Sequence, residues 1–116
     1  MKRTKQLAVE TGHLCLALPY TITNKEYVRQ LIRRSSSAGA NYRAACRAKS
    51  KPDFINKLRI VEEELDESMF FFELLAEFNQ EQKNELRNLY KEANELLSVI
   101  IASINTALKN LGAAKK

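Results

Sequence analysis

Apolar side chains recur along most of the chain at spacings of three and four positions. This period places side chains on one face of an α-helix. Residues 5–18 carry it through Leu7, Thr11, Leu14 and Leu18. No segment shows the alternation with a period of two that a half-buried strand requires. The pattern therefore predicts a chain built from helices.

Capping residues mark the starts of the second and third predicted helices. Thr23 and Glu26 have the spacing of a capping box, in which each side chain bonds the other residue's backbone N–H. Ser50 is the N-cap candidate for the third helix, where Pro52 suits the first turn. Asp53 is favoured there by the positive end of the helix dipole.

Residues that start or stop helices mark the remaining boundaries. Pro19 ends the first helix, because proline disfavours helical geometry in the residue before it. Asn79 and Gln82 form another capping-box pattern, and Gly112 is a C-terminal stop. The predicted helices are 5–18, 24–48, 51–78 and 80–110.

Helices joined by short connections predict the fold class. We expect an all-α protein, an antiparallel up-down-up-down four-helix bundle, with residues 1–116 as a single domain. Because the last three helices are long, the bundle should be elongated, about 40 Å at 1.5 Å rise per residue.

Residues 33–51, "RRSSSAGANYRAACRAKSK", could be a basic linker, a phosphate loop or part of a helix. A phosphate loop is disfavoured by the single glycine and by the absence of a following Lys-Ser/Thr pair. A helix is favoured because its period sorts the small and the basic residues of the segment onto different sides. Ser35, Ala38 and Gly39 then lie near the buried side, where small residues permit close helix packing. The predicted packing side comprises Tyr27, Leu31, Ser35, Ala38, Tyr42, Ala45 and Cys46.

The opposite side of that helix gathers basic residues. On a helical wheel they fall within roughly 80° of arc. One interpretation is a solvated face with charge pairs, and the other is a surface for nucleic-acid phosphates. We call this set the basic stripe: Lys25, Arg29, Arg33, Arg43 and Arg47.

Charge is segregated along the sequence although the net charge is only +5. Residues 25–59 hold ten basic and two acidic side chains, whereas residues 62–81 hold eight acidic and no basic ones. In an antiparallel hairpin, Arg33 lies level with Glu67 and Arg34 with Asp66. Ion pairing between the second and third helices is therefore an alternative role for the stripe, with exposed pairs contributing about 0–1 kcal/mol each.

The third helix carries two apolar stripes. Phe54, Val61, Leu65, Phe72 and Leu75 form the expected core stripe. The second stripe either packs on intramolecular neighbours or forms a self-association surface, the interpretation we favour because large apolar patches usually mark interfaces. Its members are Ile60, Phe71, Leu74 and Phe78.

Catalytic and metal-binding patterns are absent from the sequence. There is no nucleophile–base pair and no cofactor loop, so we expect no enzyme activity and no cofactor. The acidic run "EEELDE" lacks the Glu-x-x-His repeat of carboxylate-bridged metal sites, and the only histidine is His13. We expect no metal.

The two cysteines and the length of the longest apolar run indicate the cellular compartment of the chain. Cys15 and Cys46 have no metal-ligand spacing, so they are expected as small buried thiols, with a disulfide as the alternative. The N-terminus has no signal-peptide pattern, and "LLSVIIASI" is too short to span a bilayer. The chain is therefore expected in the cytoplasm, without a membrane partner.

Residues 20–105 combine a Q-[IL]-x-R-[SA] helix start, a segment of small residues and Asn, and a phenylalanine-led third helix with a central Glu. Here these are Gln30, Arg33 or Arg34, residues 38–41, Phe54 and Glu67. In this pattern the chain resembles the bacterial four helix bundle protein family, also called the 23S ribosomal RNA intervening-sequence proteins.

The resemblance implies a four-helix bundle that often assembles as a homopentameric ring. The accessory variability protein of diversity-generating retroelements is a family member that binds nucleic acid and a reverse transcriptase. We therefore expect a non-enzymatic homo-oligomer that binds RNA or DNA through the basic stripe. The alternative is a protein-interaction or scaffold module without a nucleic-acid role. If the chain is associated with a retroelement, a reverse transcriptase is the protein partner that the resemblance implies.

Overall fold

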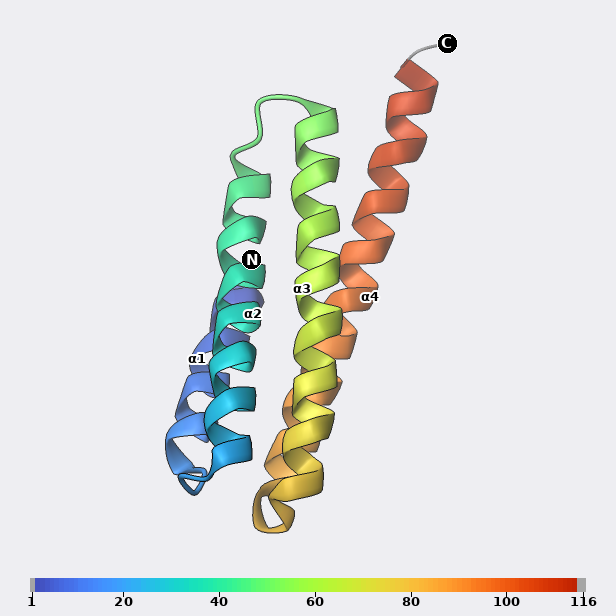
Figure 1. The fold of residues 1–116 in the computed structure, drawn as a ribbon. Helices are drawn as coiled ribbons and strands as arrows, with labels where there is room; N and C mark the ends of the chain where they lie inside the picture. Colours follow the sequence, from blue (N-terminus) through green and yellow to red (C-terminus); the bar gives the residue numbers. More distant parts are fainter. Residues whose placement is uncertain (1, 115–116) are drawn as a thin grey trace.

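The computed structural model describes residues 2–114 and confirms the antiparallel up-down-up-down four-helix bundle (Figure 1). No strand occurs within this range. The elements are α1 (Lys2–Ala17), α2 (Ile22–Cys46), α3 (Lys51–Phe78), a single 3₁₀ turn η1 (Gln80–Gln82) and α4 (Lys83–Ala114). The predicted range 51–78 matches α3, and the other helix ends shift by a few residues.

The bundle is longer than the sequence predicted, with extents of 55 × 21 × 19 Å. Helix α4 has 32 residues. At the rise of an ideal α-helix, α4 alone exceeds the length predicted for the whole bundle. The last turns of α4 also project beyond the end of α3 in Figure 1. These two features account for the extra length.

Helix α1 covers only part of the bundle. It has 16 residues against 25 in α2, so its first turn lies beside the C-terminal third of α2, where Gly39 adjoins the backbone of Thr4 (Figure 1). An ion pair ties this first turn to α4, because Nε of Arg3 lies 3.0 Å from Oε1 of Glu92. The last turn of α2 extends past the start of α1 (Figure 1).

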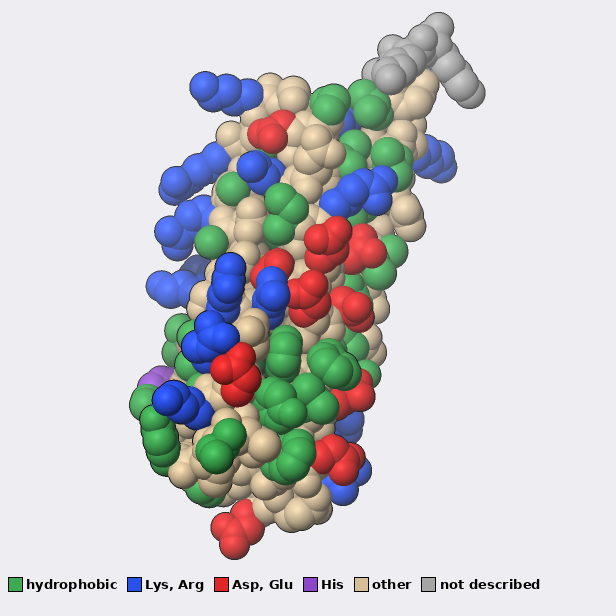
Figure 2. Space-filling model, viewed as in Figure 1, with side chains coloured by type: hydrophobic (Ala, Val, Ile, Leu, Met, Phe, Trp, Pro, Cys, Tyr) green, Lys and Arg blue, Asp and Glu red, His purple; other side chains and the backbone are tan. Residues whose placement is uncertain are grey.

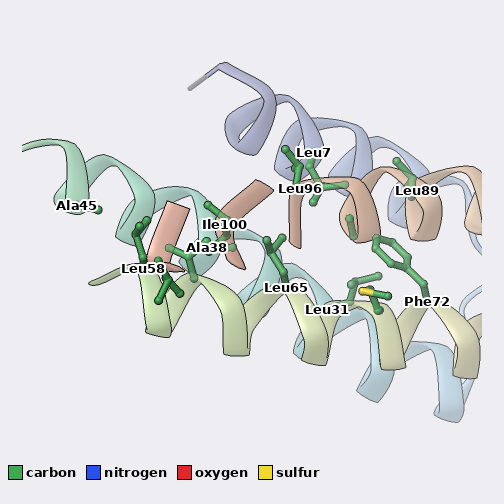
Figure 3. Packing of buried hydrophobic residues seen from close by; sticks show 14 of the residues in the cluster. Leu7, Leu31, Ala38, Ala45, Leu58, Leu65, Phe72, Leu89, Leu96 and Ile100 are labelled. Atoms are coloured by element: carbon green, nitrogen blue, oxygen red, sulfur yellow. The ribbon is translucent and has the colours of Figure 1, made fainter. Parts of the chain in front are cut away.

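All four helices contribute to one hydrophobic core. Figure 3 shows side chains from each helix pointing into the shared interior. Burying side chains of this size stabilises the fold by about 1.5–3 kcal/mol each. The fully buried large side chains include Leu7, Leu31, Leu58, Val61, Leu65, Phe72, Leu75, Leu86, Leu96 and Ile100. Phe54, predicted for the core, is only half-buried at its margin.

Small residues let α1 approach α2, as the sequence predicted. Ser35 and Ala38 are buried. A Cβ built on Gly39 would lie 3.6 Å from the carbonyl oxygen of Thr4, an ordinary van der Waals contact. The backbones are therefore close at this point, and alanine would still fit.

The start of α2 differs from the prediction. The N-cap is Thr21 rather than Thr23, and its Oγ1 accepts a hydrogen bond from the backbone N–H of Asn24 at 3.1 Å. The start of α3 confirms the prediction, since Oγ of Ser50 accepts from the N–H of Asp53 at 3.2 Å.

Asn79 does not form the predicted capping box with Gln82. Its amide instead exchanges two hydrogen bonds with the amide of Asn24, at 2.7 and 2.8 Å, and also donates to the carbonyl of Leu75. Asn24 in turn donates to the carbonyl of Pro19. Both asparagines are buried, so this network joins the α1–α2 turn to the end of α3.

The predicted stop at Gly112 is wrong, because α4 continues to Ala114. A glycine that ends a helix usually adopts the left-handed conformation. No glycine within the described range has a positive φ, so Gly112 stays helical.

The prediction of two buried thiols is correct in part for Cys15 and wrong for Cys46. Cys15 is half-buried and Cys46 is exposed, and both are free, so no disulfide joins them. Cys46 lies in the last turn of α2, at the edge of the bundle. Burial raises the pKa of the Cys15 thiol to about 11.

Candidate nucleic-acid interface and apolar faces

The helical geometry of α2 brings the predicted basic stripe together on one exposed side. All five side chains, Lys25, Arg29, Arg33, Arg43 and Arg47, are exposed. Only Arg29 has an ion-pair partner among the described residues. Its Nη2 donates to Oε1 of Glu26 at 2.8 Å, within the same helix. That hydrogen bond lowers the pKa of Glu26 and raises the pKa of Arg29.

Ion pairing between α2 and α3 uses Arg34, which lies outside the stripe. Its Nη1 donates to Oε1 of Glu64 at 3.5 Å. Its Nε lies 2.9 Å from Oε2 of Glu67, at an angle that does not make a hydrogen bond. The expected pairs Arg33–Glu67 and Arg34–Asp66 do not form, because Arg34 faces α3 and Arg33 faces away from it.

The hairpin register was nevertheless close to correct. The sequence placed Arg34 level with residue 66, and its observed partners are at 64 and 67. What the sequence missed was which member of the Arg33–Arg34 pair faces the neighbouring helix. Four of the five stripe cations therefore have no acidic partner within the described residues.

Figure 2 shows the charge segregation on the surface. Lys and Arg side chains gather along the edge formed by α1 and α2, and Asp and Glu side chains gather over α3. The two helices carry opposite charge in the sequence, and their packing keeps the charges on separate faces. Anions are therefore attracted to the edge that α1 and α2 share.

Two lysines of α1 extend the basic surface, and sequence reasoning did not include them. Lys2 and Lys5 line a hollow of about 260 Å³ together with Arg43 and Arg47 of α2. The missed signal was their spacing of three positions, which places both side chains on one side of α1. The basic surface thus spans two helices.

The predicted interface residues of α3 differ in exposure. Ile60 is 37% and Phe78 55% exposed, whereas Phe71 and Leu74 are half-buried. The ring of Tyr27 in α2 lies 6.2 Å from that of Phe71 and 5.9 Å from that of Phe78, centre to centre. Part of the second stripe therefore has an intramolecular neighbour, which was the alternative interpretation.

Phe70 belongs to the same surface and was missed. Its side chain is 55% exposed, and its ring packs edge-on against Phe71 at 5.6 Å. The run "FFF" could have identified it, since three consecutive positions cover more than half of a helix turn. Apolar side chains gather over α2 and α3 in the lower half of Figure 2. We call this surface the aromatic face: Tyr27, Phe70, Phe71, Leu74 and Phe78.

A second apolar surface lies on the outer side of α1 and α2. Val9 and Leu16 of α1, with Val28 and Ile32 of α2, line a groove of about 420 Å³. Leu16 is 85% exposed. The apolar period of residues 5–18 marks only the buried positions of α1, so it does not predict this groove.

Neither metal-binding nor membrane-spanning features occur in the described part of the chain. No three His, Cys, Asp or Glu side chains of residues 2–114 lie close enough together to hold a metal ion. Among the described helices, none combines the length and apolar character needed to cross a membrane.

Comparison with known proteins agrees with the fold. A crystal structure of a protein of unknown function from the S23 ribosomal protein family of Bacteroides thetaiotaomicron superposes with a TM-score of 0.78. The two chains share 27% identity over 89% of this chain and 95% of the other. No curated protein matches the chain at a significant level. The 23S rRNA-intervening sequence protein family matches residues 1–102. The chain therefore belongs to the 23S rRNA-intervening sequence protein family.

Proposed function

We propose that this protein is a non-enzymatic, homo-oligomeric bundle that binds the backbone of RNA or DNA through the basic stripe. One observation carries the proposal. Five cations occupy one exposed side of α2 and of its C-cap residue Arg47, and four of them lack an acidic partner within the described residues. Unpaired Lys and Arg side chains attract phosphates and release counterions when they bind them.

The length of the stripe suits a nucleic-acid duplex. Lys25 and Arg47 are separated by 22 positions, which corresponds to about 33 Å along a helix. One turn of B-form DNA measures about 34–36 Å. A duplex lying along α2 could therefore meet all five cations with phosphates from about one helical turn.

The family name refers to a ribosomal RNA sequence, which makes RNA the first ligand to test. The stripe consists of Lys and Arg side chains, which we propose contact phosphates rather than base edges. Contacts of these residues with phosphates fix position without reading bases. We therefore expect binding that depends strongly on salt and weakly on nucleotide sequence.

The aromatic face supports the homo-oligomeric part of the proposal. Phe70 and Phe78 are each 55% exposed and lie on one surface with Tyr27. Exposed apolar patches of this kind usually mark protein interfaces. Assembly would bring several basic stripes together on one particle, and multivalent contact increases affinity without any new kind of bond.

A scaffold module without a nucleic-acid role is the second candidate function. The same exposure of Phe70 and Phe78 favours it, because an aromatic face can equally take a different protein. The two functions differ in their response to salt and to loss of charge. Titration of the protein with structured RNA and duplex DNA at two salt concentrations separates them, because only the first predicts binding that weakens steeply with salt.

A further inference from the structure

The hollow between α1 and the end of α2 has features that the open stripe lacks. Lys2 and Lys5 line it from α1, Arg43 lines it from α2, and Arg47 lines it as the C-cap residue of α2. The two lysines are three positions apart and the two arginines four, so each pair lies on one side of its helix. Helix packing thus converges four cations on one concavity.

These four cations are not neutralised by the protein. None of them has an ion-pair partner within the described residues, and no Asp or Glu lines the hollow. Arg3, which lies between the two lysines in the sequence, turns to α4 and pairs with Glu92 instead. The four like charges therefore repel one another, and a bound anion would reduce this repulsion.

The size of the hollow limits what can enter it. A volume of about 260 Å³ equals roughly nine waters at about 30 Å³ each. This lies below the usual range of about 300–1,000 Å³ for drug-sized ligands. A phosphate with part of its sugar has the right size, whereas a duplex does not.

Neutral groups at the edge of the hollow also suit a phosphate. Gly39 lines the hollow, where the backbones of α1 and α2 come close together. The phenol of Tyr42 lines the same space, and burial followed by contact with Cys46 raises its pKa. The hydroxyl therefore stays protonated and can donate a hydrogen bond to an oxyanion.

We infer that this hollow is a binding site for a terminal phosphate group of a nucleic-acid strand, held by Lys2, Lys5, Arg43 and Arg47. A terminal phosphate carries a charge of about −1.5 to −2 at neutral pH, whereas each internal phosphate carries one negative charge. Four neighbouring cations therefore bind a terminal phosphate more tightly than an internal one. The inference rests on the proposed function, and it adds preference for a strand end to general backbone binding.

The test compares short single-stranded RNAs of one sequence that end in a 5′-phosphate, a 3′-phosphate or hydroxyls alone. We expect the wild-type protein to bind one phosphorylated strand at least about tenfold more tightly, the effect of one additional charge-assisted hydrogen bond. Lys5→Gln/Arg47→Gln should abolish this preference. Lys25→Gln/Arg33→Gln removes the same charge from the part of the stripe outside the hollow and should keep the preference. Equal affinity of the wild type for all three strands would overturn the inference.

A second readout does not require RNA binding. Inorganic phosphate, compared with chloride at equal ionic strength, should raise the melting temperature of the wild type and of Lys25→Gln/Arg33→Gln. It should not raise that of Lys5→Gln/Arg47→Gln. Salt-dependent RNA binding without any end preference would retain the proposed function and reject the phosphate site. Phosphate-dependent stabilisation without RNA binding would reject the proposed function and, with it, the assignment of the bound phosphate to a nucleic-acid strand.

Discussion

Arg34 of α2 and Glu67 of α3 form an ion pair across the helix interface, with Nε and Oε2 2.9 Å apart. Glu64 accepts from the same guanidinium. The neighbouring Arg33 is exposed and has no such partner within the described residues. Two adjacent arginines thus have different roles, one between helices and one on the surface.

Substitution of these two arginines should separate stability from ligand binding. A double-mutant cycle of Arg34→Gln and Glu67→Gln should give a coupling free energy of about 0.2–1 kcal/mol, because both side chains are partly exposed. Arg33→Gln should leave the free energy of unfolding nearly unchanged and weaken RNA binding. Urea unfolding and fluorescence anisotropy measure the two effects. If Arg34→Gln weakens RNA binding as much as Arg33→Gln does, the division of roles is wrong.

The buried Asn24–Asn79 pair should stabilise the bundle. Asn79→Ala leaves the amide of Asn24 without its partner in a buried site, so we expect a loss of about 1–3 kcal/mol in the free energy of unfolding. Asn88→Ala is the matched control, since Asn88 is exposed on α4. Denaturant unfolding measures both variants. Losses of equal size in the two variants would show that the pair contributes little.

The two cysteines should differ in reactivity. A thiol with a pKa of about 11 is almost entirely protonated at pH 8, and the thiolate is the reactive form. Alkylation by iodoacetamide should therefore be slow at Cys15. Cys46 is exposed and should react first. Mass spectrometry of digested protein assigns the label to each site.

Alkaline pH should also weaken the folded state through Cys15. Because its pKa is raised in the folded state, the unfolded chain releases the proton at lower pH. The stabilisation is complete below the unfolded pKa of about 8.5 and is lost as pH rises through about 11. Cys15→Ala should reduce this part of the pH dependence. Equal alkylation rates at the two thiols of the native protein would contradict the assigned burial.

The aromatic face should control assembly. Phe70→Ser removes an exposed ring at little expected cost to folding, because the side chain is 55% exposed. We expect light scattering to show a lower mass for this variant than for the wild type. Leu16→Ser, on the α1 surface, is the control and should keep the wild-type mass. A monomeric wild type at micromolar concentration would reject this self-association surface.

The sequence predicted the helices well where periodicity and capping agreed, as at Ser50 and along 51–78. It failed where a side chain had a choice of partner. Thr21 and Thr23 both suit an N-cap, and Asn79 suits a cap locally, but the buried amide of Asn24 gives Asn79 a long-range partner. Local patterns contain no information about such contacts.

The candidate site was predictable only in part, for a similar reason. The helical period alone places the five basic residues on one side of α2. It does not show that Arg34 pairs with α3, because that contact depends on which side of α2 packs against α3. Nor does it place Lys2 and Lys5 beside Arg43 and Arg47, since that contact depends on how α1 packs against α2.

The central claim is that the unpaired cations of the basic stripe bind nucleic-acid phosphates. The most direct test measures RNA affinity as a function of salt for the wild type, Arg33→Gln/Arg43→Gln/Arg47→Gln, and the charge-matched control Lys83→Gln/Arg87→Gln/Lys91→Gln on α4. We expect the slope of log affinity against log salt to become shallower by about 2 for the stripe variant on single-stranded RNA. The control should keep the wild-type slope. No binding at low salt, or equal loss in the two variants, would contradict the claim.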